Sequence, residues 1–163
     1  MGDILFHKED YVFSYRVAGI LICDNKVLLQ KPNDSEYYAF PGGHVSYGET
    51  TSETLIREFL EEAGADIEIA ELQWVEENFF SWSGKPCHQI SLSHLVKLKD
   101  AAQIPYDGRF IGKEYRENDA NAIYFYWIPL DEVKNINVYP TNAAELLLCL
   151  DEGVKHFVYR EGE

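Results

Sequence analysis

The sequence predicts a single α/β domain in which helices pack on a mixed β-sheet, and three observations support this fold class. The chain has 163 residues, of which 46% are apolar, so it can form one hydrophobic core. Apolar runs of strand length are separated by turn signals. Strand and helix patterns do not alternate regularly, which argues against a doubly wound parallel sheet. We therefore expect one domain over residues 1–163.

The N-terminal third predicts a β-hairpin followed by a loop. Residues 14–31 consist of two apolar runs around Asp24 and Asn25, a pair typical of tight turns. Residues 37–48 contain one proline and three glycines, too many for a regular element. We predict an ordered loop there that leads directly into a helix.

The helix that follows has the clearest signals in the chain. Thr50 and Glu53 have the spacing of a capping box, and Gly64 stands where helices commonly end. Apolar residues recur at helical spacing at Leu55, Ile56, Phe59, Leu60 and Ala63. The pattern predicts a helix from residue 51 to residue 63.

The second half of the chain predicts two more strands and a second helix. Residues 89–98 and 122–128 have strand composition, and the polar stretch 99–121 between them predicts a long loop. Residues 141–150 have an apolar helical face, with Thr141 as the N-cap. These elements and the hairpin together predict the mixed sheet with packed helices.

The net charge of the chain bears on which kinds of molecule it can bind. The net charge is −14 and Lys and Arg are not clustered, which argues against a nucleic acid polymer. A small phosphorylated substrate remains compatible, because bound divalent cations can reverse the local charge.

The same composition predicts a location by elimination. No apolar run reaches the length of about eighteen residues that a membrane span needs, and the polar N-terminus does not resemble a signal peptide. The cysteines, Cys23, Cys87 and Cys149, are far apart and odd in number, which predicts reduced thiols. We therefore expect a cytoplasmic protein that does not contact a membrane.

Three carboxylates share one stripe of the first predicted helix. On a wheel of about 100° per residue, Glu61 and Glu62 fall within about 60° of Glu58, opposite the apolar face. A solvated acidic face is the ordinary explanation of such a run. However, like charges at this spacing destabilise a helix by about a few tenths of a kcal/mol, and the helix dipole disfavours anions in its C-terminal half. The stripe therefore predicts a hard divalent cation, Mg²⁺ or alternatively Mn²⁺.

Two further residues are placed to support this stripe. Glu49 stands directly before the capping residue, and Arg57 lies on the helix flank beside Glu58 and Glu61. The two could form a weak surface ion pair, or an orienting pair that holds the carboxylates in position. We favour the orienting pair.

Seven residues in this region have a fixed spacing: Gly43, Glu49, Arg57, Glu58, Glu61, Glu62 and Gly64. Residues 43–65 thereby resemble the Nudix box, G-x5-E-x7-R-E-U-x-E-E-x-G-U, at all of its fixed positions. The segment FPGGHV, residues 40–45, overlaps the start of the box, and the segment WIPLDEV, residues 127–133, lies outside it. Both also resemble the family. Ala65 departs from the pattern, which prefers a bulkier apolar residue there.

The resemblance implies an α/β/α sandwich around a mixed sheet, with the box as a loop-helix-loop catalytic motif. It also implies Mg²⁺-dependent hydrolysis of a nucleoside diphosphate linked to another moiety, by attack of water at phosphorus. It makes Glu58 and Glu62 the principal metal ligands, with Glu61 in the same shell and the Gly42 carbonyl as another oxygen donor.

The resemblance further implies that Glu49 and Arg57 belong to the catalytic set with these glutamates. In many relatives an acidic residue outside the box completes the site from the loop before the last long strand. Glu114, Glu117 and Asp119 lie in that loop, and we predict Glu117.

The sequence leaves the substrate and two other functions open. Arg16 and Lys31 are candidates for phosphate contacts, and aromatic residues such as Phe80 and Tyr126 are candidates for stacking on a base. The alternatives are a catalytically silent module that senses nucleotides and an isomerase of isoprenyl diphosphates. A homodimer is also left open.

Overall fold

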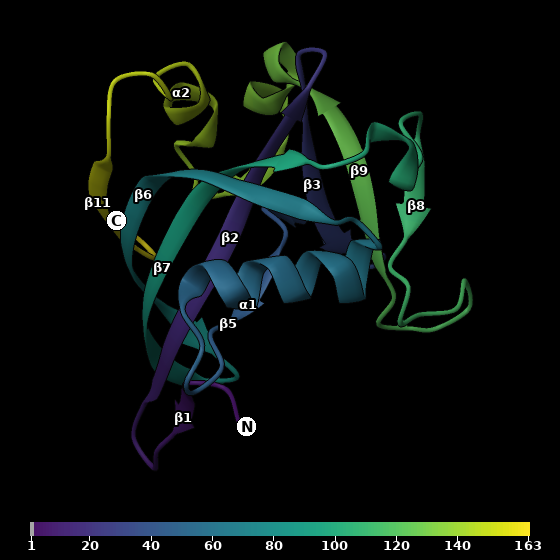
Figure 1. The fold of residues 1–163 in the computed structure, drawn as a ribbon. Coiled ribbons are helices and arrows are strands. Elements are labelled where there is room, and N and C mark those ends of the chain that lie inside the picture. The colour runs from purple at the N-terminus through teal and green to yellow at the C-terminus, as the bar shows by residue number, and fades with distance from the viewer. Residues whose placement is uncertain (1) are drawn as a thin grey trace.

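A mixed β-sheet forms the centre of the computed structural model, which describes residues 2–163 (Figure 1). The strands are β1 (Leu5–His7), β2 (Val12–Cys23), β3 (Lys26–Pro32), β4 (Tyr37–Ala39), β5 (Gly42–His44), β6 (Ile67–Trp82), β7 (Lys85–Leu98), β8 (Arg109–Ile111), β9 (Ile123–Pro129), β10 (Asn137–Tyr139) and β11 (Lys155–Arg160). The helical segments are α1 (Thr51–Glu58), the π-helical turn η1 (Phe59–Ala63), the 3₁₀ turns η2 (Ala101–Gln103) and η3 (Leu130–Asn135), and α2 (Ala143–Leu147).

The main strand order is β10-β4-β3-β2-β7-β6-β11. Neighbours β2 and β7, β6 and β11, and β4 and β10 are parallel, whereas the other pairs in this order are antiparallel. The short strands β1 and β5 also pair with β2, and β9 pairs with β3 and β8. The sheet is therefore mixed, as the sequence predicted.

The predicted hairpin is present, but its two strands stay together only near the turn. Asp24 and Asn25 have φ values of 47° and 62°, the left-handed conformations that a two-residue hairpin turn requires. β2 and β3 pair at two positions beside this turn and then diverge, β2 along β7 and β3 along β9. The predicted loop 37–48 contains the short strands β4 and β5, and β5 pairs with β2.

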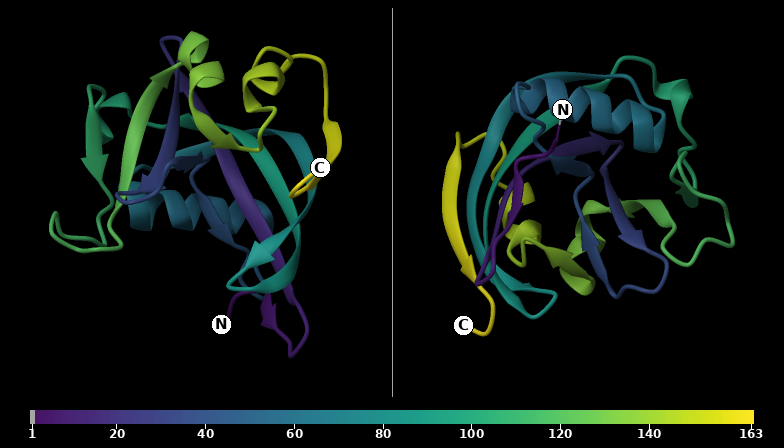
Figure 2. Two further views of the ribbon diagram at one scale, coloured as in Figure 1. Left: turned by 180° about the vertical axis from the view of Figure 1, so that it is seen from behind. Right: turned by 90° about the horizontal axis from the view of Figure 1, so that it is seen from below.

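The sheet buries apolar side chains on both faces, because successive residues of a strand point to opposite sides. Along β2, Val17 packs into one hydrophobic cluster and Ala18 into the other. Leu55 of α1 belongs to the first cluster, and Ala143 and Leu147 of α2 belong to the second. The two helices therefore cover different faces of the strands, the α/β/α arrangement expected from the sequence (Figures 1 and 2).

The helix that carries the carboxylates begins and ends as predicted. The Thr50 side chain accepts a hydrogen bond from the backbone of Glu53 at 3.2 Å, and the Glu53 carboxylate accepts one from the backbone of Thr50 at 2.7 Å. The last turn widens into η1 and stops at Gly64, whose φ of 72° is left-handed. Ala65 is fully buried in the first cluster, so the smaller residue at this position still packs in the core.

Two strands that the sequence did not predict, β6 and β11, pair in parallel at one edge of the sheet. Alternation of apolar and polar residues is broken in β6, because the register to β7 shifts between Ile69 and Glu71 and again between Leu72 and Trp74. Such irregular strands carry a weak sequence signal.

The prediction of the C-terminal helix was wrong at both ends. α2 is shorter than residues 141–150, and its N-cap is Asn142 rather than Thr141, without a side-chain capping bond. Leu148 is 80% exposed, so a longer helix would bury little more apolar surface, and burial stabilises short helices more than propensity does. In the predicted loop 99–121, η2 and β8 are the regular elements.

Among the described residues, no helix is long and apolar enough to cross a lipid bilayer. The three cysteines are free thiols in this part of the chain.

Candidate active site

Two adjacent glycines in β5 bring the loop against β2 and α1. A Cβ atom at Gly42 would overlap the carbonyl oxygen of Val17 on β2. A Cβ atom at Gly43 would lie 2.7 Å from the carboxylate carbon of Glu58. Gly42 therefore allows the strands to approach each other, and Gly43 leaves room for the Glu58 carboxylate.

The predicted pair between Arg57 and Glu49 is present. Arg57 donates from Nε to Glu49 Oε1 at 3.1 Å and from Nη2 to Glu49 Oε2 at 2.9 Å. The Thr54 hydroxyl also donates to Glu49 Oε2, at 2.6 Å. Because Glu49 is held by α1 at two points, it fixes the guanidinium in one orientation. These hydrogen bonds hold the pKa of Glu49 below its ordinary value.

The remaining bonds of this guanidinium reach the carboxylate stripe. Nη1 of Arg57 donates to Glu58 at 2.8 Å and to Glu61 at 3.3 Å, and Nη2 donates to the Ser46 hydroxyl at 3.0 Å. One side chain thus orients two glutamates of α1 and η1 and ties them to the loop. Arg57 acts through other residues in this way, as a positioning residue.

The charged forms of the Glu58 and Glu62 carboxylates are disfavoured in this site. Burial raises the pKa of Glu58 above its ordinary value. Burial, followed by the nearby charges of Glu58 and Glu114, raises the pKa of Glu62 to about 8. A cation between these groups would relieve the repulsion and lower both values.

The loop before β9 lies against the end of the helix. The backbone N–H of Lys113 donates to the Glu62 carbonyl at 2.8 Å, which brings Glu114 close enough to act on the Glu62 carboxylate. Glu117 is exposed, and its carbonyl accepts a bond from the Tyr124 hydroxyl at 3.4 Å. Glu114 is therefore the loop acid that acts on Glu62, while Glu117 as a metal ligand stays a prediction.

The donor set suits a hard cation. Within residues 2–163, no group of three or more His, Cys, Asp or Glu side chains is already arranged to hold a metal ion. Glu58, Glu61 and Glu62 nevertheless offer carboxylate oxygens, which Mg²⁺ prefers, on consecutive turns of one helix. The space over Gly43 is filled by the Glu58 carboxylate, so the loop and the helix share this centre.

Arg16 of β2 connects this centre to a pocket. Burial lowers its pKa, whereas the charges of Glu76, Glu62 and Glu58 act in the opposite direction. Its Nη2 donates to the Phe40 carbonyl at 2.8 Å. Arg16, a candidate from the sequence, thus lies between the carboxylates and the pocket. Lys31 instead donates to the Ser35 carbonyl and lies over the rings of two tyrosines, Tyr38 and Tyr126.

The pocket has a volume of about 370 Å³ and contains residues that the sequence did not single out. It is lined by Arg16, Ala39, Glu76, Asn78, Phe80, Ser81, Gln89, Ser91, Tyr139, Pro140, Tyr159 and Glu161. Apart from Arg16 and Phe80, none of them was a candidate. They come from β2, β4, β6, β7 and the segments around β10 and β11, so sequence spacing gave no sign that they meet.

A family model described as "NUDIX domain" matches residues 14–147. An ADP-ribose pyrophosphatase of Methanocaldococcus jannaschii is 45% identical over 51 residues, which are 29% of this chain and 30% of that protein. A putative mutator protein MutT4 of Mycobacterium tuberculosis is 26% identical over 102 residues, which are 63% of this chain and 36% of that protein. The chain thus spans about a third of the length of these curated relatives.

Solved structures show the same fold. The crystal structure of a UDP-X diphosphatase is similar with a TM-score of 0.62 at 18% identity, covering 90% of this chain and 66% of that one. A NUDIX hydrolase from Nitrosomonas europaea has a TM-score of 0.61 at 21% identity, covering 94% of this chain and 80% of that one.

Proposed function

Because the family model covers residues 14–147, the chain belongs to the Nudix family, and we propose that it is a Mg²⁺-dependent hydrolase of a nucleoside diphosphate linked to another moiety. The observation that carries this proposal is the carboxylate centre of Glu58 and Glu62, in which Arg57 holds Glu58, Gly43 leaves room for it, and the pKa values of both glutamates are raised. A surface of ordinary solvated glutamates would not need a glycine to make room for one carboxylate and an arginine to hold it.

Each residue of the box has a definite task in this proposal. Glu58 and Glu62 would hold the metal, Glu61 would join the same shell, and Arg57 with Glu49 would keep these carboxylates in place. Bound Mg²⁺ supplies a positive charge that neutralises the diphosphate oxygens and lowers the pKa of water. A carboxylate of this centre would accept the proton of the attacking water, and Arg16 would face the phosphate chain from the pocket side.

Two ligands of the proposal lie outside the carboxylate stripe. The Gly42 carbonyl is proposed as an oxygen donor, on a strand whose close contact with Val17 already requires glycine. The second is an acidic residue of the loop before β9, for which the sequence predicts Glu117. Glu114 is the alternative ligand, because its charge acts on Glu62.

The names of the relatives support the substrate class. The UDP-X diphosphatase and the ADP-ribose pyrophosphatase are named for substrates in which a nucleoside diphosphate is linked to a second group. Since the matched stretch covers only part of the curated relatives, their activities enter here as support for a proposal.

The first experiment separates and quantifies the cleavage products of nucleoside triphosphates, ADP-ribose, sugar nucleotides and dinucleoside polyphosphates, with Mg²⁺, with Mn²⁺ and with EDTA. We expect turnover that requires the metal and falls about 10³-fold in Glu62→Gln, because a metal ligand supports several kcal/mol of charge stabilisation. Glu68→Gln, an exposed glutamate of β6, is the matched control and should keep full activity. Turnover retained in Glu62→Gln would contradict the assigned role.

The same assay decides between the two loop acids and between the alternative functions. Glu114→Gln should lower activity if this residue is the additional ligand, and Glu117→Gln should do so if the sequence prediction holds. A folded protein that binds nucleotides with no turnover across the panel would favour the silent sensing module instead.

A further inference from the structure

A polar network that the hydrolytic chemistry does not use forms one wall of the pocket beside Arg16. Glu76 and Asn78 of β6 and Gln89 of β7 contribute its side chains. Glu76 is 5% exposed and Asn78 9% exposed, so both are almost fully buried. A buried carboxylate is costly unless its oxygens have partners, so the bonds that Glu76 already accepts decide what it can still offer to a ligand.

Hydrogen bonds within the network fix what each group can still offer. The Asn78 amide nitrogen donates to Glu76 Oε2 at 3.3 Å and to Gln89 Oε1 at 3.2 Å. Both amide hydrogens of Asn78 are then used, and its Oδ1 remains as an acceptor. The Gln89 amide nitrogen donates one hydrogen to the Ser14 hydroxyl at 3.0 Å and keeps a second hydrogen.

Glu76 keeps the strongest accepting capacity in the wall. Besides the bond from Asn78, it accepts one from the Ser93 hydroxyl at 3.0 Å, which leaves a lone pair on each oxygen. Arg16 supplies a positive charge nearby. The wall therefore presents acceptors at Glu76 and Asn78 and a donor at Gln89.

Aromatic side chains enclose the same space. Phe80 follows Glu76 and Asn78 on the same side of β6, and Tyr139 and Tyr159 line the pocket with their ring centres 5.8 Å apart. A volume of about 370 Å³ lies in the range of pockets that hold a small ring system. Flat aromatic walls with a polar floor favour a planar heterocycle.

We propose that this space is a guanine pocket, formed by Glu76, Asn78, Phe80, Gln89, Tyr139 and Tyr159, and that Glu76 accepts hydrogen bonds from the base. Guanine presents two adjacent N–H donors and one carbonyl acceptor on one edge, complementary to two acceptors and one donor. Adenine and cytosine each present one exocyclic donor beside a ring nitrogen that is an acceptor. With either base, this ring acceptor would face an acceptor of the wall. The inference rests on the proposed function, since Arg16 would lie between this base and the diphosphate at the metal.

The test compares hydrolysis of GTP and inosine triphosphate, which differ only in the exocyclic amino group. We expect kcat/KM for GTP to exceed that for inosine triphosphate by about 10-fold or more, because a donor to a buried carboxylate is lost. In Glu76→Gln this ratio should fall close to one, mainly through the loss with GTP. Equal rates for the two nucleotides in the unmodified protein, or an unchanged ratio in Glu76→Gln, would overturn the proposal.

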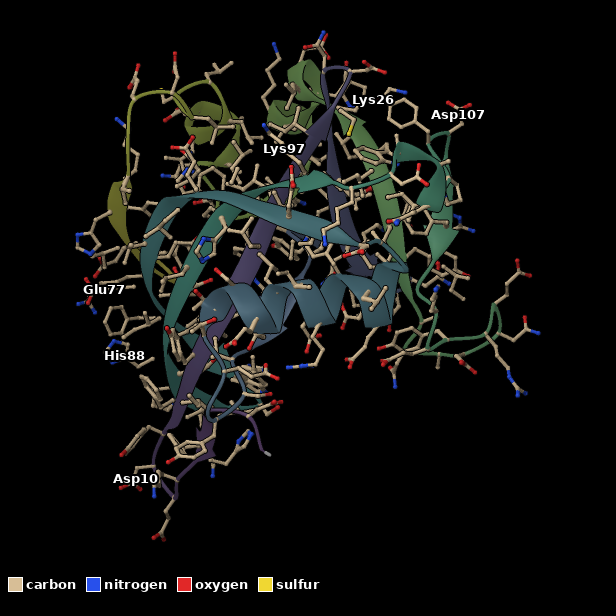
Figure 3. The ribbon with its side chains drawn as sticks, in the orientation of Figure 1. Asp10, Lys26, Glu77, His88, Lys97 and Asp107 are labelled. Carbon is tan, nitrogen blue, oxygen red and sulfur yellow. The ribbon has the colours of Figure 1, made fainter. Side chains whose placement is uncertain are left out.

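Glu77→Gln is the matched control, because Glu77 is the next residue of β6 and points to the other face. It pairs with His156 of β11 at 2.7 Å, and Figure 3 shows it at the periphery of the molecule beside β11. This variant should keep the GTP preference. If Glu76→Gln does not fold, Asn78→Ala should lower the ratio in the same direction, because it removes the second acceptor.

A binding measurement separates this inference from the proposed function. Calorimetry with GMP, IMP and AMP on the Glu62→Gln protein needs no hydrolysis. Preferential binding of GMP that disappears in the Glu62→Gln/Glu76→Gln protein would support the guanine pocket even if no diphosphate were cleaved. Metal-dependent turnover without preference among these nucleotides would support the hydrolase and refute the guanine pocket.

Discussion

The carboxylate centre and the guanine pocket both bury glutamate side chains, but they are built from different parts of the chain. The carboxylate centre comes from residues 43–62, and one charged side chain, Arg57, binds three of its glutamates. The pocket wall comes from separate strands, and one neutral amide and one hydroxyl bind its glutamate, Glu76. The bonds that hold the carboxylate centre come mostly from one short stretch of sequence, whereas the pocket exists only when β2, β6 and β7 are aligned.

The sharpest test of the local unit is Gly43→Ala. The backbone at Gly43 does not have positive φ, so alanine fits the chain, but its Cβ would lie 2.7 Å from the Glu58 carboxylate carbon. Glu58 must then move, and a displacement of about 1 Å at a reacting centre can lower the rate about 10²-fold. We expect a fall of that order in kcat/KM, measured at saturating Mg²⁺, with the GTP preference unchanged.

A double-mutant cycle shows whether the effect passes through Glu58. Gly43→Ala should lower the melting temperature of the unmodified protein but have little effect when Glu58 is already alanine. Equal effects in both backgrounds would mean that the added methyl group acts on the loop and not on the carboxylate.

The same contrast explains what the sequence could predict. Thr50, Glu53 and Gly64 act on their own helix, so their spacing alone fixed where the helix begins and ends. The bond between Arg57 and Glu49 could be predicted because both belong to one pattern. The mixed sheet followed from the order of apolar runs and turns.

The pocket could not be predicted, for a physical reason. Asn78 and Gln89 meet because β6 and β7 pair, and Glu76 lies in line with Arg16 because both are in register with Ser91 of β7. Their sequence neighbours give no sign of this, and the bulges in β6 hide the strand itself. Similarly, Glu114 comes close to Glu62 through a backbone bond from Lys113, which no spacing rule reveals.

A second test weakens the local unit without removing its charge. Arg57→Lys keeps the positive charge but loses the planar fork that binds Glu49, Glu58 and the Ser46 hydroxyl together. We expect Mn²⁺ affinity, measured by calorimetry, to fall about 10- to 100-fold, the range typical of residues that orient ligands. Activity should partly recover at high metal concentration, since the ligands themselves remain. A kcat that stays low at saturating metal would instead give Arg57 a direct role at the substrate.

The smallest effect is expected in the thermal stability of the metal-free protein, where variants of Glu62 and Glu76 can be compared. The native pKa of Glu62 is raised to about 8, so the native state holds a proton that the unfolded state releases near its ordinary value. Stability is therefore lost as pH rises through this interval. Glu62→Gln removes the ionisation, so its melting temperature in EDTA should exceed that of the unmodified protein by a margin that grows between pH 5 and pH 8, to a few degrees. Burial also raises the pKa of Glu76, against hydrogen bonds from Asn78 and Ser93 and the charge of Arg16, so the gain for Glu76→Gln should change with pH in the same direction. A margin for Glu62→Gln that is constant with pH would mean that the carboxylate centre is not strained by its own charge.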